Sequence, residues 1–186
     1  MSTSAFYPAE RGPAFSISKT SIDIDEIHQR VRLATRVFVA GVAADQWSAA
    51  TNCDMDVRAL VNHLVSGSLW AVELIQGKTI AEVGPRLDGD MLADNPLAAY
   101  DSALSAAQSA FSGPGADTFI HGWDIARATG QDSTLDPELV DIVYAVFKPQ
   151  DAMLQASGVF APPVDVPADS DTQTLLLAML GRDNRP

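Results

Sequence analysis

Cysteine, clustered basic residues and long apolar segments are what this sequence has least of. Cys53 is the single cysteine among 186 residues, so an intrachain disulfide is excluded. The 12 lysines and arginines form no cluster and are outnumbered by 24 aspartates and glutamates, which gives a formal net charge of -12 at pH 7. The basic patch that binds a phosphate backbone is therefore missing, and we expect no nucleic-acid partner.

Two kinds of apolar segment are also missing. No stretch approaches the roughly 18 consecutive apolar residues that a membrane-spanning helix requires. The N-terminal region has no basic segment followed by an apolar one, so we expect neither a membrane span nor a secretory signal. Together with the single cysteine, these absences favour a reducing, cytoplasmic setting.

The composition favours one domain with a sizeable core, because 47% of the residues are hydrophobic and only 19% are charged. Residues 1–20 contain Pro8, Gly12 and Pro13 and show no sustained period, which predicts an irregular N-terminal arm. We expect residues 21–183 to form a helical domain that includes a short helical C-terminal tail.

The apolar residues after the arm recur at three- and four-residue steps, and no alternating strand pattern stands out, so the predicted fold is all-α. The first helix spans about 22–43. The second begins after Asp56, whose side chain suits an N-cap, and ends near Gln76 or Gly77. Further helices are predicted at about 96–111, 116–129, 137–147, 151–156 and 172–180.

The segment from Gly77 to Asn95 has the composition of a long connection without an element of its own. Its eighteen or so residues reach up to roughly 60 Å, about twice the length of a 20-residue helix. The chain can therefore return along the second helix, so that the second and third helices run parallel.

Asp117 and His121 are four residues apart on the fourth predicted helix, which places both side chains on one face. His63 offers a second imidazole from the second helix. Two histidines and one carboxylate would occupy three positions of a catalytic zinc-type site and leave the fourth open. Because D-x-x-x-H also occurs by chance in many helices, the pattern alone is a weak signal.

Asp124 lies one turn beyond His121, where it could accept a hydrogen bond from a ligating imidazole and fix its tautomer. The alternative is an exposed acid paired with Arg127 or Arg58. We expect His28 to be an ordinary core or surface residue. Cys53 has no cationic neighbour in the sequence, which favours a structural role over a reactive thiolate.

The turn Ser112 to Gly115 is tight, so it limits where the fourth predicted helix can start. If the fourth helix starts beside the end of the second, His63 lies roughly 21 Å from that end and His121 only roughly 8 Å. The two imidazoles would then differ in height by about 13 Å. This estimate predicts that they do not converge unless the third helix ends lower in the bundle or the fourth slides.

Three segments together resemble a known family: D-Q-W-S-A-A-T-N-C-D-M-D-V-R-A-L-V-N-H-L, D-T-F-I-H-G-W-D-I-A-R-A-T-G and L-L-L-A-M-L-G-R-D. They are similar to the DinB-like metal-binding proteins related to mycothiol-dependent maleylpyruvate isomerase, and most to an uncharacterised actinobacterial branch. The resemblance covers about residues 22–183. It implies a four-helix bundle with parallel second and third helices, and metal ligands at His63, Asp117 and His121. The isomerase has a glutamate where this chain has Asp117.

The resemblance implies a divalent metal, with zinc favoured by the nitrogen and oxygen ligands and nickel, iron or manganese as alternatives. It also implies a small-molecule substrate and a low-molecular-weight thiol such as mycothiol, used in transfer or isomerisation, or else metal-assisted hydrolysis. The isomerase has a separate C-terminal domain that contributes to its active site, whereas we expect a short helical tail after the fourth helix of this chain, so isomerase activity is not carried over. The alternative is a non-catalytic binding or assembly module with a degenerate metal site. A homodimer remains open.

Overall fold

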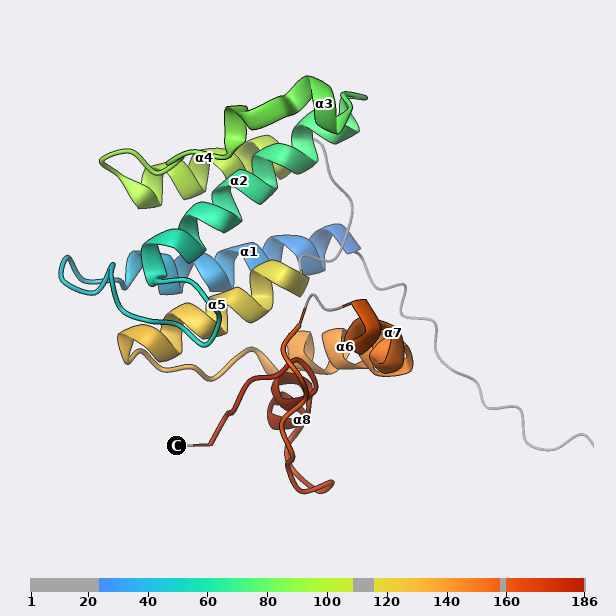
Figure 1. Cartoon of the computed structure of the whole chain (residues 1–186). Coiled ribbons are helices and arrows are strands. Elements are labelled where there is room, and N and C mark those ends of the chain that lie inside the picture. Colours follow the sequence, from blue (N-terminus) through green and yellow to red (C-terminus); the bar gives the residue numbers. More distant parts are fainter. Residues whose placement is uncertain (1–23, 109–115, 158–159, 186) are drawn as a thin grey trace, which may run out of the picture.

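The computed structural model describes residues 24–108, 116–157 and 160–185 (Figure 1). Over these residues the fold is all-α, as predicted, and contains no β-strand beyond an isolated bridge between Ala50 and Asp56. The predicted N-terminal arm at residues 1–20 and the turn Ser112 to Gly115 lie outside the described residues.

Four helices carry the candidate site or pack around it: α1 (Ile24–Ala40), α2 (Val57–Ile75), α4 (Pro96–Gln108) and α5 (Ala116–Thr129). After α5, the described part of the chain forms α6 (Pro137–Phe147), α7 (Asp151–Ser157) and α8 (Thr172–Met179). Asp56 caps α2 as predicted, since its side chain accepts a hydrogen bond of 2.8 Å from the backbone N–H of Ala59.

The connection between α2 and α4 was expected to lack secondary structure, and this prediction is wrong. It contains the short helix α3 (Ile80–Val83) and a 3-10 turn at Gly84–Leu87. Thr79 and Glu82 explain the helix start, because each side chain accepts a hydrogen bond from the other residue's backbone N–H. This is a capping box, a sequence signal that the glycine and proline content of the segment obscured.

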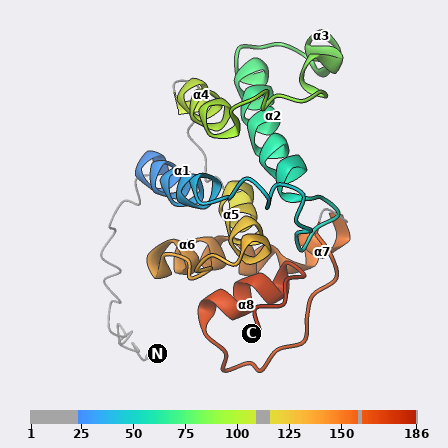
Figure 2. The ribbon, with the colours of Figure 1, turned by 90° about the vertical axis from the view of Figure 1, so that its left-hand side faces the viewer.

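The four site-forming helices pack against one another, α1 on α4 and α5 and α2 on α4 and α5. In Figure 1, α2 and α4 run in the same direction, as the long connection allows. Arg58 in the first turn of α2 accordingly contacts Asp90 and Ala93, just before α4 begins. Figure 2 shows α5 between the group formed by α1, α2 and α4 and the C-terminal helices.

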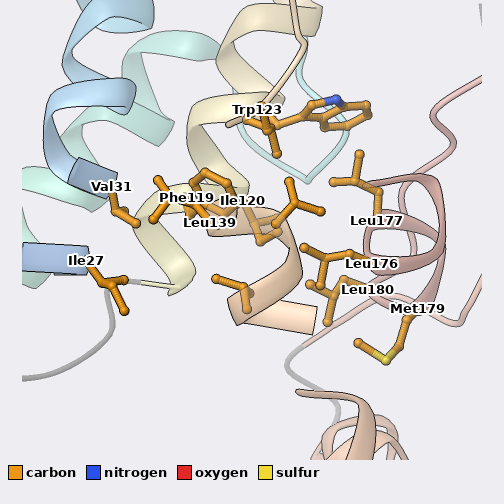
Figure 3. Close-up of a cluster of buried hydrophobic side chains, with 13 residues drawn as sticks. Ile27, Val31, Phe119, Ile120, Trp123, Leu139, Leu176, Leu177, Met179 and Leu180 are labelled. Carbon is orange, nitrogen blue, oxygen red and sulfur yellow. The ribbon is translucent and has the colours of Figure 1, made fainter. Parts of the chain in front are cut away.

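The central position of α5 explains why every residue from Phe119 to Ala126 is buried. One face of α5 packs with α1, α6 and α8, and another with α2 and α4. Figure 3 shows Leu177 beside Trp123, with Leu176 and Leu180 on the α8 side of the same cluster. The C-terminal tail is therefore part of the core.

Candidate metal centre

The imidazole rings of His63 and His121 lie together between α2 and α5. Their centroids are 5.4 Å apart and the ring planes are nearly perpendicular, at 89°. His121 is buried, whereas His63 reaches the surface. The predicted difference in height of about 13 Å is therefore wrong.

The level at which α5 starts explains the error. From Val57 to Ile75, α2 rises about 27 Å, and His63 lies about 9 Å above its start. If α5 starts about 18 Å above the same level, His121 lies about 10 Å above it, beside His63. The prediction names two exceptions, a third helix that ends lower and a fourth helix that slides, and the 5.4 Å between the rings requires one of them.

The backbone of Asp117 belongs to the first turn of α5, one turn before His121. Its side chain lies outside the described part of the structure. Its role as a third metal ligand therefore stays a prediction based on helical spacing and family resemblance.

Asp124 is completely buried and lies beside His121, with 3.0 Å between Asp124 Oδ2 and His121 Nδ1. The alternative pairing with Arg127 or Arg58 is wrong, because Asp124 pairs with Arg182. The guanidinium donates from Nη2 to Oδ2 at 2.9 Å and from Nε to Oδ1 at 3.4 Å. In the sequence, the terminal G-R-D segment is the only signal for Arg182, and it indicates no role for this residue.

The pairing with Arg182 decides the hydrogen-bond direction at His121. The guanidinium has only donors, so both oxygens of Asp124 act as acceptors, and Nδ1–H of His121 donates to Oδ2. In the neutral imidazole this leaves the lone pair on Nε2, the form in which histidine binds a metal.

Cys53 also lies near this cluster, although the sequence favoured a purely structural role. One ligand atom from each of Cys53, His121 and Asp124 lies within 4.8 Å of the other two. The thiol is 3.0 Å from Thr51 Oγ1, within the loop that leads into α2. No single motif links Cys53 to His121, because the loop and α5 are distant in the sequence.

A cavity of about 430 Å³ opens beside His63. Its walls are α2 and the end of the 3-10 turn, and its lining residues are Ala59, Asn62, His63, Ser66, Gly67, Trp70, Leu87 and Asp88. Asn62 of α2 binds the segment that follows the turn through two hydrogen bonds. Its side chain donates to Gly89 O at 3.0 Å and accepts from Met91 N at 2.7 Å. A small molecule in the cavity would reach the exposed side of His63.

Comparisons with known proteins agree with the resemblance. The model of the mycothiol maleylpyruvate isomerase N-terminal domain family matches residues 28–135. Two uncharacterized proteins of Mycobacterium tuberculosis, MT0763 of strain CDC 1551 / Oshkosh and Rv0738 of strain ATCC 25618 / H37Rv, are each 31% identical over 140 residues. The matches cover 60% of this chain and 70% of each relative. No solved structure matches. Within the described residues, no helix is long and apolar enough to cross a membrane.

Proposed function

The chain belongs to the mycothiol maleylpyruvate isomerase N-terminal domain family, and from this premise we propose that it binds a divalent metal through His63, Asp117 and His121. We further propose that the metal centre serves a transfer or isomerisation reaction that uses a low-molecular-weight thiol, in a reducing cytoplasmic setting. The observation that carries the proposal is the convergence of two imidazoles from α2 and α5.

The spacing of the two rings fits a shared metal ion. With Zn–N bonds of about 2.1 Å and tetrahedral angles, two imidazoles on one zinc ion place their centroids about 5.2 Å apart. The observed distance is 5.4 Å. Edge-to-face aromatic contacts without a metal span about 4.5–7 Å. A measurement of metal content therefore distinguishes a shared ion from a direct contact between the rings.

The donor set matches zinc chemistry, because two imidazole nitrogens and one carboxylate oxygen leave a fourth position open. A metal held there would supply Lewis acidity that lowers the pKa of a thiol. The chain's own contribution is to hold His121 through Asp124 and to admit the second reactant through the cavity beside His63. Trp70 and Ser66 offer that reactant an apolar surface and a hydroxyl.

A competing set of ligands would be Cys53, His121 and Asp124. The position of Arg182 disfavours it, because a metal ion on Asp124 would lie next to a guanidinium that already neutralises this carboxylate. We therefore assign Asp124 to orienting His121 rather than to binding the metal, and we leave Cys53 out of the ligand set.

Elemental analysis of the protein, purified without a histidine tag and incubated with zinc, tests the proposal. We expect about one equivalent of metal in the wild type, by the one-site stoichiometry of such centres, and its loss in His63→Ala and His121→Ala. His28→Gln is the matched control, because His28 is the one histidine outside the proposed ligand set and lies on α1. Cys53→Ser should keep the metal, and its loss there would favour the competing set.

A wild type that holds no metal would contradict the proposal and favour the non-catalytic binding or assembly module. If the metal is present, thiol-dependent transfer is the next assay. Mycothiol and an activated electrophile should react faster with the metal-loaded wild type than with His121→Ala. Equal rates would separate metal binding from catalysis and would refute the enzymatic part of the proposal.

A further inference from the structure

One side chain next to the candidate metal centre comes from the far end of the chain. Arg182 follows α8, yet only 5% of its surface is exposed, and it meets Asp124 near the middle of α5. Asp124 Oδ2 receives both the guanidinium, at 2.9 Å, and Nδ1 of His121, at 3.0 Å. One carboxylate oxygen thus connects the C-terminal tail with a proposed metal ligand.

Arg182 is itself held firmly. Its Nη1 donates to Leu180 O at 2.7 Å, and its backbone N–H donates to Leu177 O at 2.8 Å. The guanidinium carbon lies 6.0 Å from the centre of the Phe160 ring. Gly181 makes the reversal possible, since its φ of +79° lets the chain leave α8 and turn Arg182 inward.

We propose that Arg182 is a positioning residue of the metal centre: through Asp124 it fixes the ring orientation and the Nδ1–H tautomer of His121. This inference rests on the proposed function, because it assigns the imidazole a metal to bind. With Arg182 in place, the carboxylate keeps one oxygen toward Nδ1. Without it, Asp124 loses its charged partner and becomes free to rotate.

A purely structural role for this pair would have a different outcome. A buried ion pair often contributes little compared with apolar residues of similar volume, whereas the outer partners of a ligating histidine typically change metal affinity by about 10–100-fold. Metal affinity and ligand geometry are therefore more informative than stability. The pair also links the tail to the metal, so metal binding should protect the backbone amides that follow α8 from hydrogen exchange.

The experiment compares Arg182→Gln and Arg182→Lys with Arg185→Gln, measured as the full chain. Arg185 is a suitable control because it lies on the same tail but pairs with Asp183 at the surface. We expect Arg182→Gln to weaken zinc affinity by about 10–100-fold and to change the visible spectrum of the cobalt-substituted protein. Arg182→Lys keeps the charge without the fork of two donors and should recover part of the affinity.

In folded Arg182→Gln, a zinc affinity within about twofold of the wild-type value, instead of the expected loss of about 10–100-fold, together with an unchanged cobalt spectrum would overturn the inference. If that variant does not fold, Arg182→Lys carries the same test, and an unchanged spectrum there together with unchanged affinity would overturn it as well. Arg185→Gln should match the wild type in both measurements.

Nitrogen NMR of His121 in the metal-free protein separates this inference from the proposed function. We expect the Nδ1–H tautomer in the wild type and a mixture of tautomers in Arg182→Gln, measured well above the ordinary histidine pKa. A wild type that binds no metal would refute the proposed function, and the tautomer would still decide the role of Arg182. An unchanged tautomer in Arg182→Gln would overturn the inference even if the metal binds.

Discussion

His63 on α2 and His121 on α5 face each other with 5.4 Å between their ring centroids, one side chain open to the cavity and the other buried in the core. The pair therefore joins a surface that a small molecule can reach to α5, which is buried from Phe119 to Ala126. A metal ion shared by these rings would cross-link α2 to α5 and stabilise the folded state.

The first prediction concerns removal of the metal. A ligand that binds only the folded state adds about 2.7 kcal/mol to the free energy of unfolding when its free concentration is 100 times its dissociation constant. EDTA should therefore lower the melting temperature of the zinc-loaded wild type by several degrees. Differential scanning calorimetry measures the shift, and His121→Ala should show none. The same melting temperature with and without EDTA would count against the metal centre.

The second prediction concerns the burial of Asp124. Asp124→Asn leaves the guanidinium of Arg182 inside the protein without its carboxylate, which typically costs about 3–5 kcal/mol. Urea unfolding followed by circular dichroism measures this loss. Asp183→Asn removes the carboxylate of a surface pair with Arg185 and should change stability very little. Similar losses in both variants would contradict the assignment of Asp124 as the buried partner.

The sequence predicted the main helices of this fold well, because their apolar residues repeat with the helical period and because Asp56 is an N-cap residue at the start of α2. It also brought His63 and His121 forward as candidates. It could not predict their distance, since the height of each residue depends on where α4 ends, and a periodic pattern places helix ends only to within a few residues. An error of one turn moves a side chain by about 5 Å.

The partner of Asp124 was beyond local reasoning for a different physical reason. Arg127 and Arg58 are close to Asp124 or to the predicted site in sequence, whereas Arg182 reaches it only because α8 packs its leucines on α5. Arg127 instead lies over the ring of Trp123 at 5.6 Å, and Arg58 pairs with Asp90. Tertiary packing thus selects among arginines that the sequence cannot rank.

The third prediction concerns the pH response of the segment that borders the cavity. The Arg58 guanidinium, 2.7 Å from Asp90, holds the pKa of this carboxyl below its ordinary value, and the backbone N–H of Leu92 adds to the effect. Because the pKa of Asp90 is depressed in the folded state, its interaction with Arg58 stabilises the folded state fully above the unfolded-state pKa of about 3.9. It is lost as the pH falls through the lower, folded-state pKa.

Arg58→Gln should therefore raise the pKa of Asp90 toward the ordinary value, which a carbon NMR titration measures directly. Asp183 is an internal control, because Arg185 lowers its pKa to about 2 and Arg58→Gln leaves that pair intact. A pKa of Asp90 that does not move would show that Arg58 does not hold the segment in solution.

The fourth prediction concerns Arg32, a buried arginine on α1. Within the described residues its hydrogen bond is a long one, 3.4 Å from Nη1 to Leu104 O, and burial lowers its pKa. Because no carboxylate there offsets the cost of burying the charge, Arg32→Met should be neutral or stabilising by about 1–2 kcal/mol. Arg36→Met, one turn later, removes two bonds to Asp101 and should destabilise. Chemical denaturation of both variants ranks them, and the opposite order would contradict the prediction.

The last prediction compares two glycines that share a left-handed backbone but differ in their surroundings. Gly77 has φ +86° and Gly181 has φ +79°, so alanine at either position costs about 1–2 kcal/mol in backbone strain. A Cβ at Gly77 would meet nothing within 4 Å, whereas a Cβ at Gly181 would lie 2.6 Å from the Cβ of Ala161. Gly181→Ala should therefore be the more destabilising in thermal unfolding, by at least about 1 kcal/mol.

The two alanine variants should also differ at the metal centre, since a displaced Gly181 shifts the neighbouring Arg182 away from Asp124. Zinc affinity should fall in Gly181→Ala and stay at the wild-type value in Gly77→Ala, even at temperatures where both proteins are fully folded. Equal zinc affinities in the two folded variants would mean that the reversal after α8 does not set the geometry of His121.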